Sequence, residues 1–151
     1  MIHINIWGLR RLINMGLNTY LVMGRRGEVE QLLRRAREFL ETAEYQRGRG
    51  FYDLAAFSLE QALQLHLKAK ILSMGVEYPR THSVRTLLRI LSEIAPEAER
   101  AKVEQILDDY LLELGILEDA YITSRYVTRD YTEEEIDKLM NTVKRVMELV
   151  P

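Results

Sequence analysis

The sequence predicts an all-α fold, an up-and-down four-helix bundle with an additional short helix. From Glu28 almost to the last residue, apolar side chains recur at steps of three and four, the period of an amphipathic helix. Glycine and proline interrupt this period at only a few places, and we identify no credible strand. The 151 residues suit one domain, which is large enough to bury a core without disulfides or metals.

Residues 1–25 stand apart from this pattern, and we interpret them as an N-terminal appendage to a bundle over residues 26–151. Arginines and asparagines interrupt their apolar runs, so the segment is too short and too polar to span a bilayer. It is either a helix or a mis-assigned start, because Met15 and Met23 would each begin a shorter chain. We therefore expect no membrane partner.

The first core helix is predicted from Glu28 to the glycines of RGRG, and the second from Phe51 to Gly75. Their inward stripes are Val29, Leu32, Leu33, Ala36, Leu40 and Ala43, then Phe51, Ala55, Ser58, Ala62, Leu65, Ala69 and Leu72. The second helix carries further leucines beside its stripe, at Leu59, Leu63 and Leu67. We expect this surplus apolar surface to be covered by a second copy, as a homodimer.

Three more helices complete the prediction. A short one begins near Ser83 and turns Val84, Leu87, Leu88 and Leu91 inward. A long one follows Pro96 with the stripe Val103, Leu107, Tyr110, Leu114, Leu117 and Tyr121. The last begins at the capping box of Thr132 and Glu135, where Tyr131 and Ile136 can form a hydrophobic staple.

Composition limits the kinds of site. The chain has no cysteine, which excludes disulfides and cysteine nucleophiles, and we expect a cytoplasmic protein. The three histidines lack the spacing of a metal-binding helix, so we expect neither a metal nor a cofactor. Residues 1–89 carry 14 Lys and Arg against 8 Asp and Glu, and residues 90–151 carry 7 against 15. The basic half either binds phosphates or attracts the acidic half and a partner copy.

Two places carry candidate functional residues. In YITSRYVTRDYTEEE, residues 121–135, Arg125 stands beside Tyr126 with Arg129 one turn on, a set able to hold a phosphate or sandwich a base. Alternatively, Arg125 only ends a helix favourably for its dipole. His82 lies just ahead of the short helix or in its first turn, and is either functional or a capping and packing residue.

Residues 30–150 resemble a HEPN domain, a small helical nucleotide-binding module, in its stand-alone prokaryotic form. Three stretches carry the resemblance: DLAAFSLEQALQLHLKAKIL, PRTHSVRTLL and YITSRYVTRDYTEEE. In the first, Gln61 and Ala62 match the Gln-Ala pair of the family, and Leu67, Lys68 and Ala69 match its Leu-Lys-Ala. Lys68 joins the candidate phosphate-binding residues on this ground.

The resemblance implies a bundle that often pairs as a homodimer and often acts with a minimal nucleotidyltransferase as a toxin–antitoxin pair. Many members are ribonucleases that need no metal and use an arginine followed after four to six residues by a histidine. Arg125 matches the arginine, but the candidate histidine positions hold Asp130, Tyr131 and Thr132. Arginine cannot replace the missing proton-transfer group, because it does not deprotonate.

We therefore expect a non-catalytic protein that binds a nucleotide or an RNA phosphate through Arg125 and neighbouring basic residues. One alternative is a metal-independent ribonuclease in which His82 replaces the missing histidine from a different helix. Another is a structural dimeric scaffold in which arginine and tyrosine only join helices.

Overall fold

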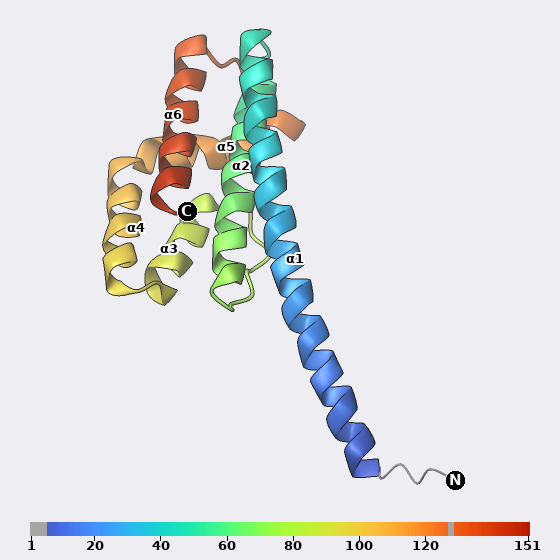
Figure 1. The fold of residues 1–151 in the computed structure, drawn as a ribbon. Helices are drawn as coiled ribbons and strands as arrows, with labels where there is room; N and C mark the ends of the chain where they lie inside the picture. Colours follow the sequence, from blue (N-terminus) through green and yellow to red (C-terminus); the bar gives the residue numbers. More distant parts are fainter. Residues whose placement is uncertain (1–5, 127–128) are drawn as a thin grey trace.

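The structure of the protein, a computed structural model, describes residues 6–126 and 129–151; side chains are described for 24–123 and 129–151. Over these residues the chain is all-α, as the sequence predicts, with six helices and no strand (Figure 1). The helices are α1 (Ile6–Gly48), α2 (Tyr52–Ser73), α3 (Val84–Ile94), α4 (Glu97–Asp109), α5 (Leu111–Tyr126) and α6 (Glu133–Leu149).

Helix α2 is the centre of the fold. It packs against α1, α3, α5 and α6, and 14 of its 22 residues are buried. Only a narrow strip of this helix is therefore exposed to solvent. We expected a second copy of the protein to cover three leucines of α2. These residues, Leu59, Leu63 and Leu67, are fully buried within the single chain. That basis for a dimer is therefore wrong, because neighbouring helices of the same chain already cover these side chains.

Helix α1 begins earlier than the periodicity indicated. Its backbone is helical from Ile6 onward, so the expected boundary near residue 25 falls inside one continuous helix. Figure 1 shows the N-terminal half of α1 projecting beyond the other helices. The described part of α1 meets the bundle at Leu32, Ala36 and Ala43, which pack on α2 as the stripe predicts.

The long helix expected after Pro96 is interrupted at Tyr110, and this prediction is corrected. Tyr110 has φ −116° and ψ 24°, and it ends α4 by donating its amide to the Ile106 carbonyl. The break lets α4 pack Val103 on α3 while α5 turns Leu114 against the core around α2. One straight helix could not pack against α3 and α2 in this way.

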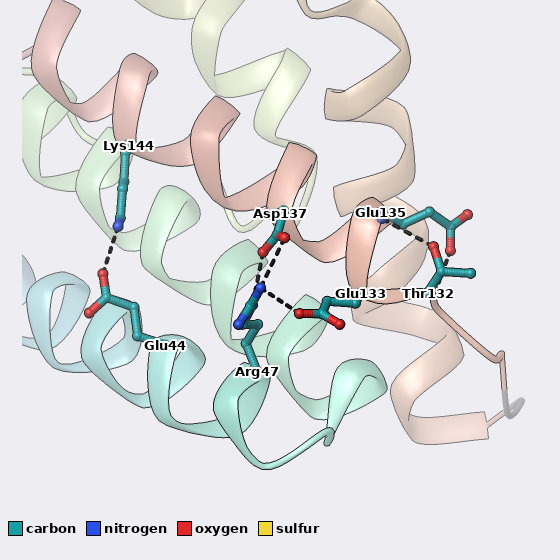
Figure 2. Close-up of polar contacts among 7 residues, drawn as sticks. All are labelled: Glu44, Arg47, Thr132, Glu133, Glu135, Asp137 and Lys144. Carbon is teal, nitrogen blue, oxygen red and sulfur yellow. Dashed lines mark hydrogen bonds and ion pairs between the residues drawn. The ribbon is translucent and has the colours of Figure 1, made fainter.

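Helix α6 is held to α1 by ion pairs at its N-terminal half (Figure 2). Arg47 donates from Nε and Nη2 to the two carboxylate oxygens of Asp137, at 2.9 and 3.0 Å, and from Nη2 to Glu133 at 2.7 Å. The hydrogen bond from Arg47 holds the pKa of Asp137 below its usual range. Lys144 pairs with Glu44 at 2.8 Å further along the same two helices.

The predicted start of α6 is confirmed. The Thr132 side chain accepts from the Glu135 amide at 3.1 Å, and Glu135 accepts from the Thr132 amide at 2.8 Å, which is a complete capping box. Tyr131 and Ile136 are both buried in the main core cluster, as the staple requires. Among the helices in the described part of the chain, none is long and apolar enough to cross a membrane.

Candidate polar site between α2, α3 and α5

A line of polar side chains runs along α2 at steps of four residues: Glu60, Gln64 and Lys68. The Gln64 amide nitrogen donates to Glu60 Oε1 at 2.7 Å, and Lys68 Nζ donates to Gln64 Oε1 at 2.9 Å. Gln61 donates to the second oxygen of Glu60, also at 2.7 Å. Each oxygen of the carboxylate therefore accepts one amide hydrogen, and Gln64 links the acid to the lysine.

His82 joins this line from the segment before α3. Its Nδ1 lies 3.5 Å from the Gln64 amide nitrogen. Its ring stacks on Tyr121 of α5, with ring centroids 3.9 Å apart and planes 17° apart, and Phe57 lies on Tyr121 at 6.2 Å. His82 thus connects α2 to α5, although its own side chain is exposed.

Local hydrogen bonds fix the segment that carries His82. The Ser83 amide donates to Thr81 Oγ1, and Ser83 Oγ caps α3 by accepting from the Thr86 amide, each at 3.1 Å. Ser83 Oγ also donates to Glu118 of α5 at 2.7 Å. The cap of α3 therefore also ties the start of this helix to α5.

Glu118 is the acceptor that holds α3 against α5. Besides Ser83, it accepts from the Arg85 amide at 3.0 Å and from Arg85 Nη2 at 2.6 Å. Burial opposes ionisation of Glu118, but the hydrogen bonds from Arg85 and Ser83 outweigh it and hold the pKa of the carboxyl below its usual range. Glu118 therefore stays ionised and keeps His82 beside Tyr121.

Glu60 is in the opposite electrostatic situation. It is fully buried, and the burial raises its pKa to about 7, against the opposing effect of the hydrogen bonds from Gln64 and Gln61. Burial also lowers the pKa of Lys68, whose ammonium lies 5.4 Å from the centre of the Tyr78 ring. Burial in the folded protein therefore disfavours the charged forms of both Glu60 and Lys68.

The other candidate residues lie at the end of α5 and beyond it. Arg125 follows Tyr121 by one turn of α5, but the side chains of Arg125 and Tyr126 lie outside the described residues. Arg129 is placed over the Tyr131 ring, 4.5 Å from its centre, and pairs with Glu135 at 3.3 Å. These contacts of Arg129 support the start of α6.

The sequence reasoning brought Lys68 and His82 forward separately and missed the residues between them, Glu60 and Gln64. A signal was present: Glu60, Gln64 and Lys68 form a polar line at steps of four on a helix whose other residues are mostly apolar. Glu118 and Tyr121 gave no such signal, because their role depends on contact with α3. No group of three His, Asp or Glu that could hold a metal occurs in the described part of the chain.

The fold and this cluster define a helical-bundle protein with a polar site where α2, α3 and α5 meet. The family model described as HEPN domain matches residues 29–151, in agreement with the resemblance read over residues 30–150. The chain belongs to the HEPN domain family.

Two solved structures are similar over most of their length. The crystal structure of TT1696 from Thermus thermophilus is 25% identical with a TM-score of 0.60, covering 81% of this chain and 94% of TT1696. The crystal structure of ST0689, an archaeal HEPN homologue, is 29% identical with a TM-score of 0.60, covering 81% of this chain and 93% of ST0689. No curated protein matches the chain.

Glu60 should make stability depend on pH. Its pKa rises from 4.5 to about 7 on folding, so the folded protein keeps a proton that the unfolded chain has lost. Stability from this group is full below about pH 4.5 and falls as the pH rises to about 7. At pH 8, Glu60→Gln should therefore raise the melting temperature by about 5 °C relative to the wild type.

Circular dichroism melts at pH 5 and pH 8 measure this difference. Glu93→Gln is the matched control, since Glu93 is exposed and the same charge is removed. Equal losses of melting temperature between the two pH values in wild type and Glu60→Gln would contradict the assignment.

Proposed function

We propose that this HEPN-domain protein binds the phosphate of a nucleotide or of RNA beside His82 and Tyr121. The observation that carries the proposal is the stacking of His82 on Tyr121, with ring centroids 3.9 Å apart. That contact brings His82 to α5 one turn before Arg125. The proposal is supported by this proximity along α5, since more than forty residues separate His82 from Arg125 in the sequence.

The charges around this place suit an anion. Lys68 donates a hydrogen bond to Gln64, which contacts His82. The negative charge of Glu118 is balanced by its ion pair with Arg85, and Glu118 also accepts a hydrogen bond from Ser83. Glu60 is buried beneath, with both oxygens bonded to amides. A guanidinium at Arg125 would bind a phosphate with two parallel hydrogen bonds, while the aromatic ring of Tyr121 favours a base or a sugar beside it.

Action together with a minimal nucleotidyltransferase, as a toxin–antitoxin-like pair, is the second part of the proposal. It is supported by membership in the HEPN family, in which such pairing is frequent. A nucleotidyltransferase reading frame beside the gene, and co-purification of the two products, would test it.

Arg125 should dominate binding. Arg125→Ala should weaken the affinity for a labelled single-stranded RNA or a nucleotide about 10-fold or more, because a charge-assisted, two-pronged contact is lost. Arg125→Lys should weaken it less, since a point charge replaces the planar donor. Fluorescence anisotropy measures both variants.

Arg100→Ala is the matched control, because Arg100 is an exposed arginine on α4. Its affinity should stay close to that of the wild type. Unchanged binding in both Arg125 variants would leave Arg125 only the role of ending α5.

A metal-independent ribonuclease is the second candidate, and the placement of His82 next to α5 favours it. His82 would replace the histidine that is missing at 130–132 and take the proton of the 2′-hydroxyl as that oxygen attacks phosphorus. The departing 5′-oxygen would then need a proton from a second donor. Arg125 would only stabilise charge, because it does not deprotonate.

His82→Ala separates binding from catalysis. A binding protein should keep its affinity within about 3- to 10-fold, since at most one neutral hydrogen bond is lost. A ribonuclease should lose turnover by about 100-fold or more. Denaturing gels of a labelled RNA, with and without EDTA, measure cleavage; reproducible cleavage that disappears in His82→Ala would replace the binding proposal by the ribonuclease.

A homodimer remains our proposal for the quaternary state, now through the outer face of α5. Leu111, Leu112 and Ile122 are 52%, 78% and 57% exposed and share this face with Gly115 and Asp119. Antiparallel pairing of two copies about a two-fold axis would place Leu111 of one against Ile122 of the other, with Gly115 near the axis. A glycine there allows close approach of the helices.

Leu112→Glu should convert the dimer to a monomer, because a charge would be buried in the apolar contact. Light scattering coupled to size exclusion at micromolar concentration measures the mass. Leu54→Glu is the control, since Leu54 is another exposed leucine, 46%, and lies at the start of α2 rather than on α5. A monomeric wild type would disprove this interface.

A further inference from the structure

We propose that Lys68 binds a second phosphate, so that the ligand of the site is an RNA strand with phosphates at both Arg125 and Lys68, and not a mononucleotide. The inference deepens the proposed function and rests on it for the phosphate at Arg125. It depends on the Lys68 ammonium, which is held in a half-buried position by two neutral groups, the Gln64 amide and the Tyr78 ring.

Lys68 differs from the other half-buried lysines and arginines whose side chains the structure describes. Each of the others has a carboxylate oxygen within 4.0 Å: Arg47, Lys70, Arg85, Arg129 and Lys144. The Lys68 ammonium instead donates to the Gln64 carbonyl oxygen at 2.9 Å, and no described carboxylate lies within ion-pair distance of it. A half-buried cation without a counter-charge is unfavourable, and burial accordingly lowers the pKa of Lys68.

Glu60 neutralises Lys68 only in part. Gln64 lies between these two residues on α2, donating to the acid and accepting from the lysine. Burial also raises the pKa of Glu60 to about 7, so a large fraction of the molecules have no negative charge there at neutral pH. The positive charge of Lys68 is therefore available to an anion from outside the chain.

Tyr78 is the second group that holds the ammonium. Lys68 Nζ lies 5.4 Å from the centre of the Tyr78 ring, which is within the range of a cation–π contact. The Tyr78 hydroxyl donates to Glu28 of α1 at 3.2 Å, and the adjacent Glu77 pairs with Arg25 of α1 at 3.7 Å. Tyr78 is thus a positioning residue, because its ring is fixed to α1 and keeps the flexible lysine in one place.

The contacts between Lys68 and α5 indicate which ligand fits. Lys68 is bonded to Gln64, Gln64 contacts His82, and the His82 ring lies on Tyr121, one turn of α5 before Arg125. Several side chains therefore separate the two cations. The two phosphates of a nucleoside diphosphate share an oxygen atom and would reach only one cation. Phosphates of successive nucleotides have a ribose between them and suit the wider spacing.

The salt dependence of RNA affinity tests Lys68. Each phosphate of a single strand that a protein cation neutralises contributes about −0.7 to the slope of the logarithm of the binding constant against that of the salt concentration. Lys68→Met removes the charge at similar length, so affinity should fall about 10-fold at low salt and the slope should become about 0.7 less negative. Lys68→Arg keeps the charge and should restore both quantities, measured by fluorescence anisotropy.

Lys70→Met is the matched control. Lys70 is another half-buried lysine of α2, but Glu99 already pairs with it at 4.0 Å. The variant should leave the RNA affinity and the salt slope unchanged, and circular dichroism verifies that both methionine variants fold. Equal changes in Lys68→Met and Lys70→Met would overturn the assignment of Lys68.

Competition by AMP and ADP against the labelled RNA tests the class of ligand. AMP has one phosphate, which we assign to Arg125, so Lys68→Met should leave the affinity for AMP unchanged while Arg125→Ala reduces it. ADP should compete little better than AMP, because its phosphates adjoin. ADP that competes as strongly as unlabelled RNA would overturn the assignment to a strand.

The outcomes distinguish this inference from the proposed function. If Arg125→Ala weakens RNA binding but Lys68→Met changes neither the affinity nor the salt slope, the second phosphate is wrong and the proposed function stands. If RNA binding depends on Lys68 but not on Arg125, the phosphate assigned to Arg125 is wrong and Lys68 stands. A wild type that binds no RNA would overturn both.

Discussion

The burial of α2 among four other helices is the constraint on which the rest of the structure depends. A helix inside a bundle cannot leave polar side chains in water, so each one must find a partner in the protein. Ser58 donates to Gln46 of α1, and His66 is bonded to the Val150 carbonyl after α6. Burial lowers the pKa of His66, which keeps this imidazole neutral at physiological pH. The polar residues of α2 thus specify how α1 and the end of the chain dock on it.

The same constraint builds the candidate site. Gln64 and Glu60 satisfy each other inside the helix, and only the remaining amide hydrogen and the lysine side chain extend toward the surface. His82 is brought there by the cap of α3, whose serine is bonded in turn to Glu118 of α5. A shift of any of these three helices would therefore change the position of the His82 side chain, although the residue itself is exposed.

Sequence reasoning succeeded where structure is decided locally. The start of α3 near Ser83, the capping box of Thr132 and the inward stripe of α3 all depend on residues within one or two turns, and all are confirmed. It failed at Tyr110, because the apolar period continues unchanged through a break that packing against α3 requires. The link between His82 and α2 likewise joins residues 18 apart in sequence, and no local pattern encodes it.

The buried acid shows why stability alone does not explain this site. An apolar residue in place of Glu60 would remove the unfavourable burial of a charge, and such replacements often stabilise a core. It would also remove the acceptor that, with Lys68, orients the Gln64 amide. The carboxyl group of Glu60 weakens folding as the pH rises to neutral, but it also accepts the hydrogen bonds that order Gln61 and Gln64 on α2.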